Sequence, residues 1–293
     1  MSTKPLTIRQ FFRQFPDDET CLQHLFEIRF GQGFPCPSCE RPSNWYRIKA
    51  ERAYSCQWCG HHLHPTVNTP FAKTRTPLQL WFYAIFMFTT TRNGVAAKEL
   101  ERQLGVTYKT AWRMADEIRK HMAEVDGDAP VGGLGKIVEI DETLVGGSKR
   151  SGWRAPRAGK TMVMGMLERD GAVLTAVVPD NRKHNLLPQI TAHVAPGSIC
   201  HTDELRSYKG ISKLGFRHDT VNHTHRYVSV TGAHVQGIEN FWAQLKRAIN
   251  GTHIHVSGKH LWKYAKEAEY RFNRRECGET MLGELLTTFR PLS

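Results

Sequence analysis

The stretch "KIVEID" (residues 136–141) decides the fold class, because its apolar and acidic residues alternate at the period of a β-strand. Glu139 and Asp141 therefore share one face of that strand. Two further strand-like stretches follow, "TMVMGML" (161–167) and "AVLTAVV" (172–178). The "ERDG" sequence between them is typical of a turn, so the pair predicts a hairpin.

The segments after this hairpin add helices and one more strand. A buried strand is predicted at "SICHT" (198–202), and helices are predicted at "NLLPQITAHV" (185–194) and "IENFWAQLKRAI" (238–249). Strands that precede helices around a mixed sheet predict an α/β domain. Upstream, "DGDAPVGGLG" (126–135) combines glycines, a proline and two aspartates without periodicity, which is typical of an interdomain connection.

The net charge of the chain indicates the class of partner. The 293 residues include 40 Lys and Arg against 28 Asp and Glu, a balance of +12. A polyanion is therefore the expected partner, although charge alone does not distinguish DNA from RNA or from an acidic lipid surface. The longest apolar stretch, "WFYAIFMF" (81–88), is far shorter than the roughly 20 residues that span a bilayer. We expect no membrane insertion and, since no secretion signal is recognisable, a cytoplasmic, nucleoid-associated protein.

Four of the seven cysteines form two CxxC pairs that predict a zinc site. Cys36 and Cys39 precede Cys56 and Cys59 by a spacing that lets two tight knuckles meet at one tetrahedral Zn²⁺. A redox motif or a disulfide pair is the weaker reading for two such pairs so close together. Four thiolates complete the coordination shell, so His61, His62 and His64 are interpreted as surface or DNA-facing residues. Cys21, Cys200 and Cys277 are interpreted as buried thiols.

A helical unit follows the cysteines. Thr76 is predicted to cap a helix that begins at Pro77 and ends at Asn93-Gly94. The next stretch, "GVAAKELERQLGVTYKTAWRMADEIRKHM" (94–122), predicts two helices joined at Gly105, the layout of a helix-turn-helix. Its second helix begins at Thr107 and presents candidate base-contacting residues: Thr107, Tyr108, Lys109 and Arg113. The alternative is an ordinary helical hairpin with a solvated basic face.

Three acidic residues are candidates for catalysis. Asp141 is expected to end the first strand and Asp203 to end "SICHT", and strand ends are where α/β sheets expose ligands. Glu239 borders the apolar stripe of the last helix, whose members are Ile238, Phe241, Trp242, Leu245 and Ile249. Between these acids lie 61 and then 35 residues, a spacing that resembles that of DDE transposases and integrases. The alternative is three solvated carboxylates among 28.

Oxygen ligands of this kind suit Mg²⁺ or Mn²⁺. Two such ions could activate an attacking oxygen and stabilise a leaving oxygen in phosphoryl transfer. Lys246 and Arg247 lie on the helix of Glu239 and are candidates for holding phosphates. Further basic residues in "SKRSGWRAPRAGK" (148–160) and "KHLWKYAKEAEYRFNRR" (259–275) fit DNA contact, although a solvated face is the usual explanation for such runs.

These motifs resemble bacterial insertion-sequence transposases with an amino-terminal zinc ribbon, the ISXO-two-like group, which is also similar to eukaryotic Merlin transposons. The matching stretches span nearly the whole chain: "FPDDETCLQHLFEIRFGQGFPCPSC", "TPLQLWFYAIF", "LGVTYKTAWRM", "EIDETLVGG", "HTDELRSY" and "GIENFWAQLKRAINGTHIHVSGKHLWKYAKEAEYRFNRR". Two positions depart from the group: Glu40 follows the first knuckle where glycine is commoner, and "VNTPF" (67–71) replaces an expected Gly-Thr pair.

The resemblance implies an RNase H-like domain in which Asp141, Asp203 and Glu239 hold the metal ions. It also implies that the upstream modules recognise terminal-repeat DNA, and that a strand cut at the transposon end supplies a 3′ hydroxyl that attacks target DNA. Joining two ends leads us to expect a homodimer or larger assembly on double-stranded DNA. The expected organisation is an amino-terminal helical segment (1–33), a zinc ribbon (34–70), a helix-turn-helix unit (71–125), a linker (126–135), the DDE catalytic domain (136–280) and a tail (281–293).

Two other functions fit the same residues. One is a structure-specific nuclease of the same fold, which would cut branched DNA without joining ends. The other is a sequence-specific DNA-binding protein that has lost catalysis, for which loss of a triad carboxylate would be the mark. All three carboxylates are present in this chain.

Overall fold

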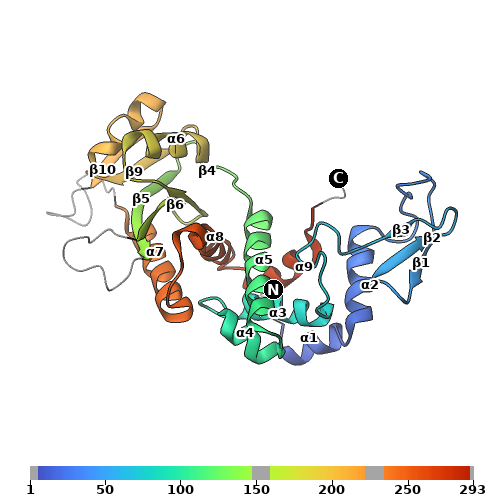
Figure 1. Ribbon diagram of the computed structural model, residues 1–293. Coiled ribbons are helices and arrows are strands. Elements are labelled where there is room, and N and C mark those ends of the chain that lie inside the picture. Colours follow the sequence, from blue (N-terminus) through green and yellow to red (C-terminus); the bar gives the residue numbers. More distant parts are fainter. Residues whose placement is uncertain (1–5, 147–158, 222–233, 291–293) are drawn as a thin grey trace. The chain divides into compact units, whose positions relative to one another are not determined.

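The computed structural model describes residues 6–146, 159–221 and 234–290 (Figure 1). The chain divides into two compact units, unit 1 (Met1–Val125 and Cys277–Ser293) and unit 2 (Asp126–Glu276). The basic loop predicted at 148–160 lies, apart from its last two residues, outside the described ranges. None of the helices within these ranges is long and apolar enough to cross a bilayer.

Unit 1 begins with two helices, α1 (Ile8–Gln14) and α2 (Asp18–Arg29). Thr7 caps α1 in a reciprocal capping box with Gln10, and the Asp17 side chain caps α2 by accepting a hydrogen bond from the Thr20 amide. Helix α3 (Leu78–Thr90) begins one residue later than predicted: Pro77 occupies its cap, and Thr76 makes no capping bond there. It also ends before Asn93-Gly94, so both boundaries predicted for this helix were wrong.

A three-stranded antiparallel sheet carries the cysteines of unit 1. Its strands are β1 (Trp45–Ile48), β2 (Ala53–Cys56) and β3 (His62–Leu63), in the order β1-β2-β3. Helix α2 packs on this sheet: the rings of Phe26 and Tyr54 stack with centroids 4.0 Å apart, and Glu19 pairs with Arg47 at 2.8 Å. These contacts join the predicted amino-terminal segment and the ribbon in one unit.

The remaining helices of unit 1 are α4 (Ala97–Leu104), α5 (Tyr108–Asp126) and α9 (Met281–Thr287), the last preceded by the 3-10 turn η4 (Gly278–Thr280). Residues 281–293, expected to form a tail, instead include α9, which packs on α2 and α3. Its apolar side chains are buried, and His121 of α5 bonds the Leu285 carbonyl at 2.9 Å. Burial of four hydrophobic side chains is the physical reason that this segment is ordered: Met281, Leu282, Leu285 and Leu286.

Unit 2 is built on a five-stranded mixed sheet with strand order β10-β9-β5-β6-β7. Strands β5, β6 and β7 form antiparallel pairs, whereas β9 runs parallel to both β5 and β10. The mixed α/β architecture predicted from the sequence is thus confirmed. The bounds are β5 (Ile137–Gly146), β6 (Lys160–Glu168), β7 (Val173–Val178), β9 (Ile199–Asp203) and β10 (Arg217–Val221).

The expected linker is partly structured within unit 2. Strand β4 (Val131–Gly132) pairs in parallel with β8 (Val194–Ala195), and Val131 is buried. Asp126 accepts hydrogen bonds from Asn273 and Arg274. Because these contacts hold residues 126–132 against the rest of unit 2, this segment has less conformational freedom than its glycine content predicts.

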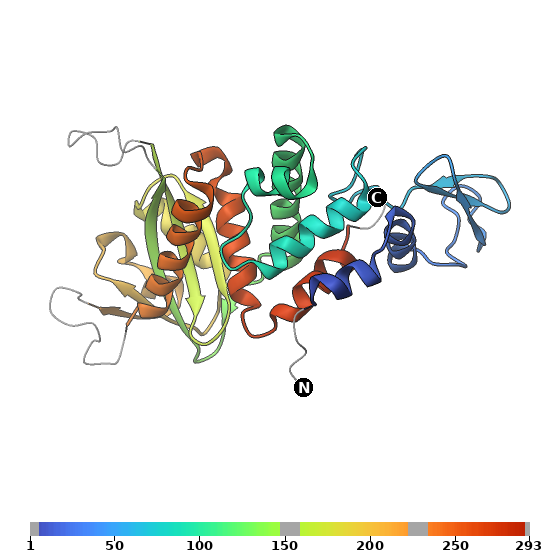
Figure 2. The same ribbon diagram turned by 90° about the horizontal axis from the view of Figure 1, so that it is seen from below.

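Helices cover both faces of the large sheet (Figures 1 and 2), and a hydrophobic core lies against each face. Helix α6 (Lys183–His193) and the 3-10 turns η1 (Arg206–Tyr208) and η2 (Ile211–Leu214) cover one face. Helices α7 (Gln236–Ala248) and α8 (Gly258–Asn273), joined by the π-helical turn η3 (Ile249–His253), cover the other. The apolar stripe predicted for α7 is confirmed, since all five members are buried.

The basic helix α8 is tied to acids of its own unit. Lys266 contacts Asp128 and Glu269, Arg271 contacts Glu267, and Arg274 contacts Asp126, and all three basic side chains are mostly buried. These three cations therefore form neither a solvated face nor a surface free to bind DNA. Both interpretations of the basic run at 259–275 were wrong for these three residues. Their partners Glu267 and Glu269 are spaced along the same helix, so an i,i+3 or i,i+4 search would have found them.

Gly165 allows α7 to lie directly on the sheet. It pairs with Asp141 across β5 and β6, and a Cβ atom placed on it would meet Ile238 Cδ1 and the Trp242 ring at 2.7 Å. No real Cβ tolerates such contacts, so any side chain at position 165 must push α7 away from β5.

Gly165→Ala should destabilise unit 2 by about 1–3 kcal/mol, the usual cost of overpacking a core. Calorimetric unfolding measures the change. Gly251→Ala is the matched control, because a Cβ at position 251 meets nothing within 4 Å. Equal melting temperatures for Gly165→Ala and the wild type would contradict this packing.

Candidate active site

Asp141 and Asp203 lie at neighbouring positions on the large sheet. Strands β5 and β9 are paired up to Glu139 and His201, and each aspartate lies two residues beyond that pair on its own strand. Asp203 ends β9, as predicted. Asp141 does not end β5, which continues to Gly146 in its pairing with β6. The prediction of a strand end at Asp141 was therefore wrong, and Asp141 instead lies where the pairing with β9 stops.

The surroundings of Asp141 disfavour its charged form. Burial, followed by the negative charges of Glu142 and then Asp203, raises the pKa of Asp141 to about 7. One carboxylate oxygen of Asp141 accepts a 3.0 Å hydrogen bond from the indole N–H of Trp242, which opposes the shift. A cation at this point would offset the unfavourable charge.

Glu142 forms an acidic group with Asp141 and Asp203. Its part in this group was not predicted from the sequence. Burial is the main cause that raises the pKa of Glu142, and the charge of Asp203 adds to it. Its carboxylate accepts a hydrogen bond from the hydroxyl of Tyr208, which is fully buried on η1. Both residues belong to stretches quoted above, "EIDETLVGG" and "HTDELRSY", but nothing in their spacing indicated the contact.

Glu239 projects from the first turn of α7 and is exposed. Trp242, one turn further along the same helix, is the residue that donates to Asp141. Helix α7 therefore carries Glu239 to the side of the sheet where Asp141 lies. Of the groups searched within the described ranges, only the four cysteines bring three or more ligand atoms within 4.8 Å of one another, so the three carboxylates do not converge that closely.

The four cysteines form a second candidate centre. Their sulfur atoms lie within 4.8 Å of one another, with Cys36 and Cys59 separated by 3.6 Å and Cys39 and Cys56 by 3.9 Å. Tetrahedral zinc with bonds of about 2.3 Å requires sulfur separations of about 3.8 Å, so the set fits Zn²⁺. The fit supports a structural zinc ion in the ribbon.

The backbone is left-handed at one residue in each of the two departures from the family pattern. Glu40 and Gly60 each follow the second cysteine of a knuckle, and both adopt left-handed conformations, with φ of 59° and 72°. Asn68, in "VNTPF", has φ of 57°. Asparagine is among the residues that tolerate this region best, whereas glutamate at position 40 is strained there.

The residues predicted to read DNA lie on the surface of unit 1. Helices α4 and α5 are joined at Gly105, which adopts the left-handed conformation with φ of 63°. Thr107, Tyr108, Lys109 and Arg113 are all exposed. Thr107 precedes α5 instead of beginning it, and Arg113 donates a 2.9 Å hydrogen bond to the Ala72 carbonyl.

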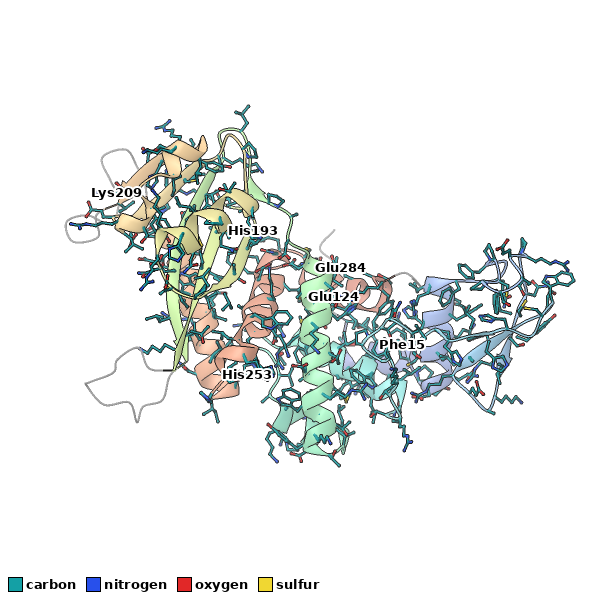
Figure 3. All side chains as sticks on the ribbon, turned by 45° about the horizontal axis from the view of Figure 1, so that its top comes forward. Phe15, Glu124, His193, Lys209, His253 and Glu284 are labelled. Atoms are coloured by element: carbon teal, nitrogen blue, oxygen red, sulfur yellow. The ribbon has the colours of Figure 1, made fainter. Side chains whose placement is uncertain are left out.

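Exposed basic residues of unit 2 lie on α7 and just after β9. Lys246 and Arg247 are exposed on α7. A cavity of about 340 Å³ follows Asp203 at the end of β9, and Arg206, Lys209 and His218 line it together with Glu204, Leu205 and Thr220. Lys209 lies on the surface in Figure 3. Arg206 and Lys209 were not among the predicted site residues, although the motif "HTDELRSY" and its flank contain them.

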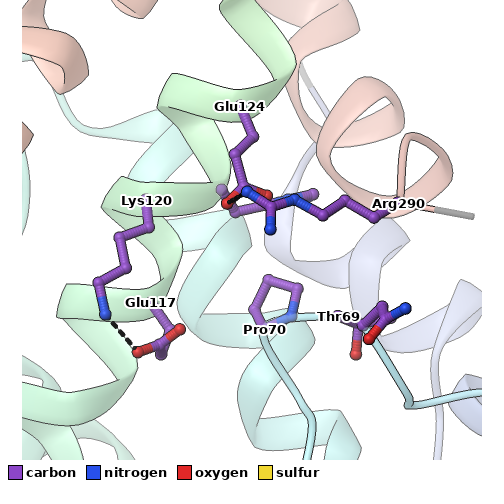
Figure 4. A pocket seen from close by; sticks show the side chains of 8 residues that line it. Thr69, Pro70, Glu117, Lys120, Glu124 and Arg290 are labelled. Atoms are coloured by element: carbon purple, nitrogen blue, oxygen red, sulfur yellow. Dashed lines mark hydrogen bonds and ion pairs between the residues drawn. The ribbon is translucent and has the colours of Figure 1, made fainter. Parts of the chain in front are cut away.

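A larger cavity, of about 510 Å³, lies in unit 1 (Figure 4). Its cations are already paired: Lys120 with Asp116 and Glu117, and Arg290 with Glu124. With its charges balanced internally, it offers no clear preference for a charged ligand.

Comparisons with known proteins agree with this arrangement. Residues 133–273 match the model of the ISXO2-like transposase domain, and residues 16–62 match the transposase zinc-ribbon domain. A transposase-like protein of Haemophilus influenzae is 37% identical over 107 residues, 36% of this chain and 83% of that protein. The chain belongs to the ISXO2-like transposase family.

A second relative of this chain is a protein in the transposable element ISH50 of Halobacterium salinarum. The two are 27% identical over 135 residues, which are 45% of this chain and 44% of that protein. The match to the transposase domain contains Asp141, Asp203 and Glu239, and the match to the zinc ribbon contains all four clustered cysteines.

Asp141→Asn should stabilise the protein in buffer free of Mg²⁺ and Mn²⁺. Burial raises the pKa of Asp141 to about 7 in the folded state, above the value of about 4 that is usual for aspartate, so its ionisation destabilises the native state as the pH rises from about 4 to 7. Asparagine removes that cost and can still accept from Trp242. We expect a gain on the order of 2–4 kcal/mol at pH 8 that fades towards pH 4, measured by calorimetry.

Asp180→Asn is the control for this prediction. A hydrogen bond from the Arg182 amide is the main cause that lowers the pKa of Asp180, so the same substitution should not stabilise the protein there. A gain for Asp141→Asn that does not vary with pH would show that charge is not its cause.

Proposed function

We propose that the protein is a DDE transposase that binds the terminal inverted repeats of its insertion sequence, cuts a strand at the transposon end and joins it to target DNA. The observation that carries the proposal is the pair of neighbouring, partly buried aspartates beside a helix that bears Glu239, within a matched transposase domain. The strand order β10-β9-β5-β6-β7, with three antiparallel strands followed by two parallel ones, supports an RNase H-like fold for unit 2.

The donor set fits Mg²⁺ or Mn²⁺. Asp141 and Asp203 offer only oxygen ligands, and burial, Glu142 and then Asp203 raise the pKa of Asp141, so a cation would stabilise its charged form. Asp141, Asp203 and Glu239 would hold two ions. When bound, such ions activate the attacking oxygen and stabilise the leaving oxygen of an in-line displacement.

The reaction conserves phosphodiester bonds in its second step. In the first, a water oxygen bonds to phosphorus at the transposon end, and the bond from phosphorus to the 3′ oxygen breaks and leaves a 3′ hydroxyl. In the second, that hydroxyl oxygen bonds to a target phosphorus, and a target 3′ oxygen leaves with a proton. Lys246 and Arg247 on α7, with Arg206 and Lys209 at the end of β9, are suited to contact the DNA phosphates.

DNA recognition is assigned to unit 1. The exposed residues at the start of α5 would read the terminal repeat, in the manner of a helix-turn-helix. The zinc ribbon and α2 would stiffen this unit and add backbone contacts. Joining two ends requires two active sites, so we propose that a homodimer or larger assembly forms on DNA.

Glu239→Gln should abolish Mn²⁺-dependent nicking of terminal-repeat DNA without loss of DNA binding. A loss of about 3 kcal/mol of transition-state stabilisation corresponds to a rate about 100-fold lower, and we expect at least that. Cleavage of labelled duplex DNA gives the rate, and a gel-shift assay gives the affinity.

Glu276→Gln removes an exposed acid of the same unit and should cleave as the wild type does. Equal nicking by Glu239→Gln and wild type would remove Glu239 from the mechanism. Cleavage of branched DNA without end joining would favour a structure-specific nuclease, and DNA binding without cleavage under any metal condition would favour a catalytically silent binding protein.

A further inference from the structure

Glu139 is an acid of unit 2 that the triad does not use. It lies on β5 two residues before Asp141, on the same face of the strand, and its side chain is 1% exposed. Burying a carboxylate is costly unless charged or hydrogen-bonding groups surround it. The groups that contact the Glu139 carboxylate therefore indicate its role in the structure.

One oxygen of Glu139 binds the start of α7. Its Oε2 atom accepts a 3.1 Å hydrogen bond from the backbone amide of Ile238, the third residue of the helix. That amide belongs to the first turn, whose N–H groups have no partner inside the helix. A negative charge at this position is also favoured by the helix dipole.

The other oxygen of Glu139 is held by Arg169. Arg169 donates to Oε1 from Nε at 3.2 Å and from Nη2 at 3.1 Å. Nη2 of Arg169 also donates to the His234 carbonyl at 3.3 Å, so the same arginine fixes the chain that enters α7. His234 Nδ1 lies 3.2 Å from Oε1, in an orientation that makes no hydrogen bond.

The second residue of α7 is a glycine that this contact requires. A Cβ atom on Gly237 would lie 2.8 Å from Glu139 Oε2 and 3.0 Å from Leu167 Cδ2. Only glycine lets the helix start come close enough for its amide to reach the buried carboxylate. The start of α7 therefore depends on Glu139 in two ways: the Ile238 amide binds the carboxylate, and Gly237 leaves room for it.

Glu239 lies between two fixed points. The amide of Ile238, one residue before it, is bound to Glu139, and the indole of Trp242, three residues after it, is bound to Asp141. Both acceptors are on β5. Because the two bonds fix the rotation and the height of α7 on that strand, they also fix where the Glu239 carboxylate can reach.

We propose that Glu139, held by Arg169, is a positioning residue that sets the place of Glu239 relative to Asp141. It does not bind metal itself. The inference rests on the proposed function, since it gives Glu139 a role through a carboxylate of the triad.

The test compares two buried acids. Glu139→Gln keeps the shape of the side chain but removes the charge that Arg169 and the helix start require. Glu269→Gln is the matched control: Glu269 is also 1% exposed, accepts from the amide and hydroxyl of Thr175, and anchors α8, which carries no triad residue. The measurements are Mn²⁺ binding by electron paramagnetic resonance, the Mn²⁺ concentration for half-maximal nicking, and amide hydrogen exchange at the start of α7.

We expect Glu139→Gln to raise the half-saturating Mn²⁺ concentration about 10-fold, the lower range for loss of a residue that orients a ligand. Binding of Mn²⁺ should weaken in parallel, and exchange at the Ile238 amide should quicken. Glu269→Gln should lower the melting temperature while Mn²⁺ binding stays at the wild-type value. Equal Mn²⁺ binding in Glu139→Gln and wild type would overturn the positioning role.

Gly237→Ala provides a second variant if Glu139→Gln folds poorly. Alanine favours the helix but forces the Glu139 carboxylate and the start of α7 apart. It should reproduce the loss of Mn²⁺ affinity with every charge retained, and unchanged affinity would also contradict the inference. A wild-type protein that neither binds Mn²⁺ nor nicks DNA would instead refute the proposed function itself.

Discussion

The close approach of α7 to strands β5 and β6 is the constraint on which the acidic centre depends. Gly165 removes the side chain that would hold the helix off, and Gly237 lets its first turn reach Glu139. The Trp242 indole then meets Asp141 directly. Without these three features a glutamate at position 239 would be an ordinary exposed acid; with them it belongs to a helix whose placement on the sheet is fixed.

The acidic centre formed by Asp141, Glu142 and Asp203 is stabilised by hydrogen bonds from Trp242 and Tyr208, and it is destabilised by repulsion among its own carboxylates. Asp141, Glu142 and Asp203 repel one another, and the pKa values of Asp141 and Glu142 are raised mainly by burial. Glu139 lies two residues before Asp141 on β5. Its negative charge is compensated by Arg169 and by a backbone amide of α7. One face of β5 therefore carries a compensated carboxylate that supports structure and an uncompensated one that is ready for a cation.

The mixed sheet, the buried face of α7 and the cysteine cluster could be predicted, because the periodicity and spacing of residues can be read directly from the sequence. The alternation in "KIVEID", the hairpin after it and the apolar stripe of α7 were sufficient for the mixed sheet and the face that α7 buries. The CxxC spacing predicted a cluster that the sulfur positions fit. Helix boundaries at Thr76 and Asn93 failed because capping depends on local backbone geometry that the residue types do not fix.

Contacts between distant segments could not be predicted. Nothing in the sequence links Tyr208 to Glu142, or Arg169 to Glu139, because each contact depends on how the strands and helices are brought together in three dimensions. The cations of α8 were misread for a related reason: their acidic partners include Asp126 and Asp128, nearly 140 residues or more away. Composition alone assigns such residues to the surface, whereas the low exposure of the Lys266, Arg271 and Arg274 side chains places these cations in the interior of the domain.

The central claim is that Asp141, Asp203 and Glu239 together hold divalent ions. Anomalous diffraction from crystals of the protein grown with Mn²⁺ tests it most directly. The account predicts manganese peaks bound by carboxylate oxygens of Asp141 and Asp203, with Glu239 completing the set. Crystals with Mn²⁺ bound elsewhere, or with none beside these residues, would contradict it.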